Sequence, residues 1–164
     1  MSKSSLKVLT IVGTRPEIIR LSRTMARLDE HLTQVIAHTG QNYDYELNEI
    51  FWTQLGLRKP DHFMNAGTTS LGETIGDILK KAEEILKIEK PDALLVLGDT
   101  NSCLSAYMAK RMHIPIFHME AGNRSYDFNN LRYREGLNGR TAANWYPDCK
   151  HRDCQPAQAF LLLL

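Results

Sequence analysis

The run A-L-L-V-L from Ala93 to Leu97 limits the fold of this chain more than any other segment. Consecutive apolar residues closed by Gly98 have the length and branching of a strand buried on both faces, which is typical of a parallel sheet. Asp99 and Thr100 follow at once, and both are good helix N-cap residues. The apolar residues that then recur at helical spacing, and predict a helix, are Leu104, Tyr107, Met108 and Met112.

A second strand is predicted beyond this helix, and it too leads into an acidic residue. Pro115 precedes the apolar pair Ile116 and Phe117, and Glu120 follows shortly afterwards. Asp99 and Glu120 thus stand at the carboxyl ends of neighbouring strands, where open α/β sheets bind their ligands. We predict that they are catalytic carboxylates. The alternative is that Asp99 is only an N-cap and Glu120 only a salt-bridge partner.

Strand and helix patterns alternate along the rest of the chain as far as Asp127. Strands are predicted at 6–12, 34–38 and 62–64, and helices begin after Thr14 and run over 45–55 and 71–86. This alternation predicts an α/β fold, a Rossmann-like doubly wound parallel sheet with right-handed crossovers. The loops expected to form its ligand site are Gly13–Arg15, Gly40–Asp44, Gly98–Thr100 and Glu120–Arg124.

The first of these loops is cationic. Gly13 ends the first strand, Thr14 and Glu17 form a capping box, and Arg15 and Arg20 add positive charge. A helix start of this kind offers unpaired N–H groups to an anion, so this turn is predicted to bind substrate. The alternative is a solvated arginine pair on the flank of a helix.

Composition and charge limit the partners. The 164 residues are 43% hydrophobic and carry a net charge of +1, which predicts one domain and no basic stripe for nucleic acid. The apolar stretch near the N-terminus is too short for a signal segment or a membrane span, so a cytoplasmic location is predicted. Cys149, His151 and Cys154 are three ligands without a fourth, so no metal site is expected.

The alternating pattern fails after about residue 130. Residues 1–130 are therefore predicted to form the domain, and 131–164 an unpatterned, disordered tail. Neither G-x-G-x-x-G nor G-x-x-x-x-G-K-[ST] occurs, so no dinucleotide cofactor or P-loop is predicted. A cationic turn facing two carboxylates suits a substrate with a phosphorylated leaving group beside a carbon that loses and regains a proton.

Four motifs resemble those of the non-hydrolysing UDP-N-acetylglucosamine 2-epimerase family. They are V-G-T-R-P-E at 12–17, H-T-G-Q-N-Y-D at 38–44, L-G-D-T-N-S at 97–102 and H-M-E-A-G-N-R at 118–124. Within the family, the chain is most similar to the capsule and O-antigen branch that makes UDP-N-acetyl-L-fucosamine. The resemblance covers residues 6 to about 128.

The resemblance implies the N-terminal half of a glycosyltransferase-B-type fold, and elimination of UDP followed by its re-addition with inversion at C2. It implies that Asp99 and Glu120 are the acid and base and that no cofactor takes part. The substrate-binding residues it implies are Gly13, Thr14, Arg15, Arg20, Thr100 and Arg124. Gln41 lies where some relatives bind a second, allosteric UDP-sugar, and Asn42 replaces their histidine. Relatives pair through helices of this domain, which implies a homodimer.

The sequence departs from the family pattern after Asn130. The family continues with a P-E-E-x-N-R helix and a second domain that supplies further catalytic groups, and neither follows here. We therefore expect a truncated or frameshifted reading frame and negligible activity from the isolated polypeptide. Two alternatives are a non-catalytic half-domain that binds UDP-sugar and the donor half of a glycosyltransferase of similar fold.

Overall fold

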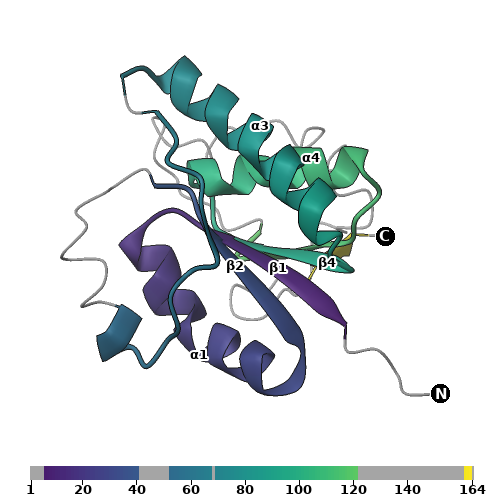
Figure 1. The fold of residues 1–164 in the computed structure, drawn as a ribbon. Coiled ribbons are helices and arrows are strands. Elements are labelled where there is room, and N and C mark those ends of the chain that lie inside the picture. The colour runs from purple at the N-terminus through teal and green to yellow at the C-terminus, as the bar shows by residue number, and fades with distance from the viewer. Residues whose placement is uncertain (1–5, 41–51, 68, 122–160, 164) are drawn as a thin grey trace, which may run out of the picture.

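A computed structural model describes residues 6–40, 52–67, 69–121 and 161–163 of the chain. Its described part is a three-layer α/β sandwich in which α1 covers one face of the sheet and α3 and α4 cover the other (Figure 1). The strands are β1 (Lys7–Val12), β2 (Thr33–His38), β3 (His62–Phe63), β4 (Ala93–Leu97), β5 (Ile116–Met119) and β6 (Leu161–Leu163). The helices are α1 (Arg15–His31), α3 (Leu71–Glu89), the 3₁₀ helix η1 (Asn101–Leu104) and α4 (Ser105–Arg111).

The sheet has the strand order β3-β2-β1-β4-β5-β6, in which the first five strands are parallel. The chain moves outward from β1 to β2 and β3, crosses over through α3, and moves outward again from β4 to β5. The order reverses between β1 and β4, and doubly wound sheets bind ligands at such a switch point. The predicted α/β class and parallel sheet are confirmed.

Helix α1 begins and packs as its sequence indicates. Thr14 is the N-cap, the predicted capping box with Glu17 is present, and Pro16 lies in the first turn, where no N–H is needed. Ile18, Leu21 and Met25 are fully buried against the sheet in one of its two hydrophobic cores. Burial of three such side chains contributes several kcal/mol at about 1.5–3 kcal/mol each. This packing fixes the start of α1 beside the carboxyl end of β1.

The second core lies under α3 and α4 and corrects one detail of the predicted pattern. Leu104 and Tyr107 are exposed, whereas Ser105 and Ala109 are buried. The predicted helix starts as the 3₁₀ helix η1, which has three residues per turn and rotates its side chains relative to an α-helix. Ser105 and Ala109 therefore face the packed side of α4 and Tyr107 points outward, while Met108 and Met112 are partly buried against the core as predicted.

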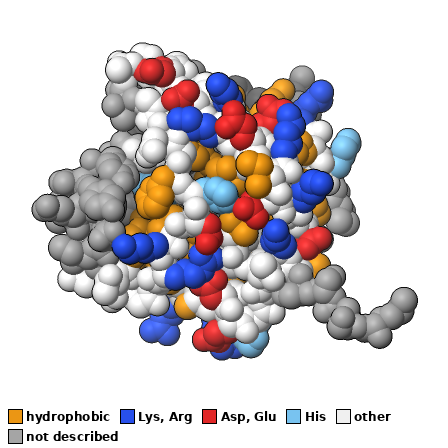
Figure 2. All heavy atoms as spheres, viewed as in Figure 1, with side chains coloured by type: hydrophobic (Ala, Val, Ile, Leu, Met, Phe, Trp, Pro, Cys, Tyr) orange, Lys and Arg blue, Asp and Glu red, His pale blue; other side chains and the backbone are white. Residues whose placement is uncertain are grey.

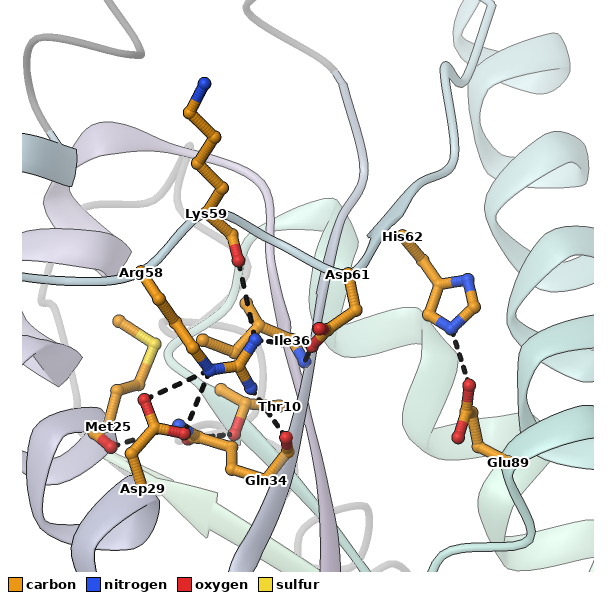
Figure 3. Close-up of polar contacts among 10 residues, drawn as sticks. All are labelled: Thr10, Met25, Asp29, Gln34, Ile36, Arg58, Lys59, Asp61, His62 and Glu89. Carbon is orange, nitrogen blue, oxygen red and sulfur yellow. Dashed lines mark hydrogen bonds and ion pairs between the residues drawn. The ribbon is translucent and has the colours of Figure 1, made fainter.

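Arg58 links elements at the amino ends of the strands, away from the predicted site (Figure 3). Its Nε donates to the Asp29 carboxylate of α1 at 3.0 Å, and its Nη1 donates to Asp61 at 2.7 Å. Its Nη2 donates to the Gln34 carbonyl oxygen of β2 at 2.5 Å. A planar guanidinium can satisfy three partners at once, so Arg58 ties the end of α1 to the sheet.

Strand β6 is the described portion of the segment for which the sequence predicts no regular structure. Leu161–Leu163 pair antiparallel with β5, with Leu163 opposite Ile116. Residues 131–160 lie outside the described residues, so the predicted disorder there stays a prediction. In the ranges that the structure covers, no helix is long and apolar enough to cross a membrane.

The surface facing the viewer of Figure 1 carries both signs of charge. Basic and acidic side chains alternate around apolar ones over this face and do not gather by sign (Figure 2). Such a mixture creates little net field to attract a polyanion.

Candidate active site

The backbone brings the two predicted acid/base residues to the same edge of the sheet. The N–H of Gly98 donates to the carbonyl oxygen of Met119 at 2.9 Å, and Asp99 and Glu120 are the residues that follow these two in the chain. Asp99 is exposed and Glu120 is half-buried. The two carboxylates therefore leave adjacent points of the backbone at the carboxyl ends of β4 and β5.

Glu120 itself stands in a costly backbone conformation. Its φ of 59° lies in the left-handed region, which disfavours a residue with a side chain by about 1–2 kcal/mol. The surrounding structure must offset this cost, and residues held in this way cluster at functional sites.

Arg20 and Glu120 form an ion pair between α1 and the end of β5. The Arg20 side chain is 55% exposed and that of Glu120 is 27% exposed, so the pair adds little to stability. A charge-assisted hydrogen bond does fix the orientation of the carboxylate. The structure thus joins a predicted substrate-binding cation to a predicted catalytic acid.

Glu17 was predicted only as part of a helix cap, and it proves to be the buried centre of the site. It is 1% exposed. Its Oε2 accepts from the backbone N–H of Gly13 at 2.9 Å, from that of Thr14 at 2.7 Å and from the Thr14 hydroxyl at 2.9 Å. The prediction of open N–H groups at this turn is therefore wrong for Gly13 and Thr14, because an internal carboxylate already occupies them.

The other oxygen of Glu17 crosses the switch point to the loop after β4. Its Oε1 accepts from the Thr100 hydroxyl at 2.6 Å and from the Ser102 hydroxyl. Thr100 was predicted to contact substrate, but its hydroxyl faces inward to Glu17 and Ser102. The capping box identified the first half of this arrangement, and no local sequence signal could identify contacts to residues more than 80 positions away.

Cys103 and His118 support the turn that precedes Asp99. The Cys103 thiol donates to the carbonyl oxygens of Leu97 at 3.1 Å and Gly98 at 3.0 Å, and His118 Nε2 donates to the latter at 2.6 Å. Burial, with a further contribution from the Glu17 charge, raises the pKa of the Cys103 thiol to about 12. Cys103 is therefore a neutral structural group and not a nucleophile.

The end of β2 packs against the first turn. The Thr39 hydroxyl is fully buried, and no residue that the structure describes forms a hydrogen bond with it. His38 Nδ1 accepts from the N–H of Gly40 at 3.0 Å, and burial lowers the pKa of His38, against an opposing effect of Glu17. His38 is thus held neutral below this edge of the sheet.

The remaining predicted residues divide into two groups. Arg15 is exposed at the first position of α1, beside Gly13 and Thr14. Gln41, Asn42 and Arg124 lie outside the described residues, so their predicted roles stay predictions. Across the described ranges, no cluster of His, Cys, Asp or Glu has the composition to hold a metal ion.

Fold and site together define an α/β protein with cationic and acidic groups at a topological switch point. The profile of the UDP-N-acetylglucosamine 2-epimerase family matches residues 25–138, and the chain belongs to this family. This confirms the predicted family.

Known relatives agree with this assignment. A UDP-N-acetylglucosamine 2-epimerase homolog from Methanococcus maripaludis is 45% identical over 74% of this chain and 34% of its own length. The UDP-2,3-diacetamido-2,3-dideoxy-D-glucuronate 2-epimerase of Pseudomonas aeruginosa is 41% identical over 81% of this chain and 38% of its own. The chain therefore spans about a third of the length of the curated relatives it matches.

A solved structure of similar fold contains nucleotides. It is the Methanocaldococcus jannaschii UDP-GlcNAc 2-epimerase in complex with UDP-GlcNAc and UDP, with a TM-score of 0.73 and 36% identity. The match covers 84% of this chain and 38% of that one. Its fold is of the predicted glycosyltransferase-B type.

Proposed function

We propose that this chain supplies the acid/base and diphosphate-binding half of a UDP-N-acetylhexosamine 2-epimerase, an isomerase. The observation that carries the proposal is the meeting of three segments at the switch point. The Gly98–Met119 hydrogen bond puts Asp99 beside Glu120, and the Arg20–Glu120 ion pair adds the start of α1. The complex of the M. jannaschii relative with UDP-GlcNAc and UDP supports the substrate class.

The chemistry needs only proton transfer and charge stabilisation. One carboxylate removes the C2 proton while the C1–O bond breaks, and UDP leaves with the electron pair. The C1=C2 double bond that forms is then attacked at C1 by the UDP oxygen, and an acid returns a proton to the opposite face of C2. The sugar is neither oxidised nor reduced overall, so no redox cofactor is required.

Asp99 and Glu120 are the two proton-transfer groups in this proposal. They follow the adjacent strands β4 and β5 at one edge of the sheet. Arg20 orients Glu120, and Arg15 neutralises the charge that develops on the leaving diphosphate. Gly13 has no side chain and lets the turn pack against Thr39, Thr14 and Thr100 shape the two loops, and Arg124 is a further substrate contact.

The proposal extends to the biosynthetic role of the chain, its oligomeric state and its regulation. The substrate class fits the cytoplasmic synthesis of precursors for capsule or O-antigen polysaccharides, with UDP-N-acetyl-L-fucosamine as one candidate product. The name of the P. aeruginosa relative supports a substituted amino sugar. We further propose that the chain forms a homodimer and that Gln41 and Asn42 lie near a regulatory UDP-sugar site.

The 164 residues alone should bind UDP-sugar weakly and turn it over very slowly. The matched part of this chain is about a third of the length of these relatives, and one wall of a site cannot by itself exclude water or fix the substrate. Positioning errors of about 1 Å can cost about a hundredfold in rate. The second candidate function is a half-domain that binds UDP-sugar without catalysing a reaction. The experiment below distinguishes it from an epimerase.

Isothermal titration with UDP and C2 epimerisation of UDP-N-acetylglucosamine followed by NMR test the proposal on one sample. We expect weak UDP binding that Arg15→Ala reduces about tenfold or more, because a charge-assisted contact is lost. Arg23→Ala removes the same charge from an exposed position further along α1 and should change affinity by less than about twofold. Equal losses in both variants would contradict the proposal, and turnover matching a full-length relative would contradict the half-site.

A further inference from the structure

We propose that Glu17 is a positioning residue that locks the cationic turn and the Asp99 loop into one unit across the switch point. The inference rests on the proposed function, because it assigns Glu17 a part in building that site. Glu17 contacts no substrate in this account. It acts through the loops that carry Arg15 and Asp99.

Each oxygen of Glu17 accepts hydrogen bonds from one of the two loops. All of the donors to Oε2 belong to Gly13 and Thr14, and both donors to Oε1 belong to Thr100 and Ser102. A carboxylate that is 1% exposed loses its hydration and must be satisfied by protein donors. Movement of either loop alone would leave one buried oxygen without partners, so the two loops are coupled.

The coupled residues are direct neighbours of the functional ones. Thr14 immediately precedes Arg15, and Thr100 immediately follows Asp99. One turn further along α1, Arg20 contacts Glu120 at the end of β5. The first turns of α1 therefore contact both acid loops, one through Glu17 and the other through Arg20.

The partners of Glu17 also determine which substitutions are informative. Backbone N–H groups can only donate, whereas the Thr100 and Ser102 hydroxyls can rotate and accept. In Glu17→Gln the amide oxygen can still accept hydrogen bonds from the N–H groups of Gly13 and Thr14, and the amide nitrogen can donate to the Thr100 and Ser102 hydroxyls. Glu17→Gln should therefore retain most of the coupling, and Glu17→Ala should lose it.

Ser102→Ala removes one of the two hydroxyl groups that donate to Glu17 Oε1, leaves the Thr100 hydroxyl in place and does not touch the helix cap. Ser105→Ala is its matched control, because Ser105 is equally buried and its hydroxyl donates to the Ser102 carbonyl oxygen at 2.6 Å, away from Glu17. Both variants remove one buried hydroxyl from the same short stretch of chain. They differ in whether the lost hydroxyl reaches Glu17.

Amide hydrogen exchange by NMR on the full 164-residue chain tests the coupling without any ligand. In Ser102→Ala we expect the amides of Gly13 and Thr14 to exchange at least about fivefold faster than in Ser105→Ala, since Glu17 is then held from the other side by the Thr100 hydroxyl alone. Glu17→Gln should restore slow exchange relative to Glu17→Ala. Equal exchange at Gly13 and Thr14 in the two serine variants would overturn the inference.

UDP titration of the same samples separates this inference from the proposed function. We expect Ser102→Ala to weaken UDP binding by about threefold to tenfold relative to Ser105→Ala, at matched thermal stability. A purely structural Glu17 would lower stability and leave the affinity of the folded chain unchanged, which would overturn the positioning role. If the wild-type chain bound no UDP, the proposed function would fail, and the exchange data would still decide whether Glu17 couples the loops.

Discussion

Gly13 occupies a position where a side chain has no room. A Cβ built on Gly13 would lie 2.3 Å from the Thr39 hydroxyl oxygen and 3.5 Å from the Thr39 Cβ. Thr39 is fully buried, so it can give way only by disturbing the packing around β2. The close approach of the Thr39 side chain to Gly13 sets the position of the turn that carries Arg15.

Gly13→Ala should therefore destabilise the chain by about 1–3 kcal/mol, the usual cost of overpacking a tight site. Urea denaturation measures it. Thr39→Ala removes the clashing oxygen, so the double variant should regain most of the loss. Gly76→Ala is the control: it lies in α3 with open space around it, and alanine should stabilise that helix by about 0.5–1 kcal/mol. A Gly13→Ala chain as stable as wild type would show that the turn is looser than described.

His38 should make stability depend on pH. Burial lowers its pKa below the ordinary 6.5, so the unfolded chain binds the proton more tightly than the folded one. Its contribution is complete above pH 6.5 and is lost as the pH falls toward the folded pKa. A single group limits this slope to about 1.4 kcal/mol per pH unit.

His38→Asn isolates this effect, because the asparagine oxygen can replace Nδ1 as acceptor for the Gly40 N–H without titrating. Urea unfolding at about pH 7.5 and about pH 5.5 should show a larger loss of stability in the wild type than in the variant. The same loss in both proteins would remove His38 as the cause.

Single residues were predictable from sequence where the signal is local. Thr14 and Glu17 were identified as a capping box because the spacing alone defines that motif. The hydrogen bond between Glu17 and Ser102 was not predicted, because only tertiary folding brings those residues together. Glu120 was predicted from its position after a strand, and Arg20 from the cationic turn; the family resemblance agreed with both, and their ion pair appears only in three dimensions.

At the scale of elements, Arg58 shows how a connection holds its neighbours in place. Its guanidinium joins α1, β2 and the segment before β3 at the end of the sheet opposite the site (Figure 3). The Gln34 carbonyl oxygen and the two carboxylates would all lose a donor without it. Arg58 therefore stabilises the scaffold and has no direct part in the site.

Arg58→Ala should lower the free energy of unfolding by about 1–3 kcal/mol, because a partly buried acceptor is left unpaired. Arg27→Ala removes another α1-associated pair whose arginine is 70% exposed, and it should cost less than about 0.5 kcal/mol. Chemical denaturation compares them. Similar losses in the two variants would mean that the Arg58 contacts contribute no more than a surface pair.

The boundaries of the elements were predicted more accurately where the hydrophobic pattern is stronger. The run Ala93–Leu97 predicted β4 with its observed bounds, since a strand buried on both faces is apolar at every position. The face of the helix after it was predicted correctly for Met108 and Met112 but wrongly for Leu104 and Tyr107, because a 3₁₀ first turn changes the periodicity. Strand β6 had no alternating pattern, and its pairing with β5 depends on tertiary context.

At the scale of the whole molecule, the strand order places all proposed chemistry at one switch point. The α/β class followed from the alternation of patterns, and the family followed from four spaced motifs. The chain covers about a third of its curated relatives, so the proposed site is the part of an epimerase site that β1, β4 and β5 carry. UDP-sugar binding by this part of the site can be tested on the chain alone, because Glu17 holds its loops together.

The most direct test is an NMR titration of the ¹⁵N-labelled chain with UDP-N-acetylglucosamine, reading every backbone amide. The account predicts shifts concentrated in three segments: 13–20, 98–102 and 118–121. Amides around Arg58 and along α3 should stay unchanged. Shifts centred on those distant elements, or no shifts at ligand concentrations that saturate a weak site, would contradict the claim that the carboxyl ends of these strands form a UDP-sugar site.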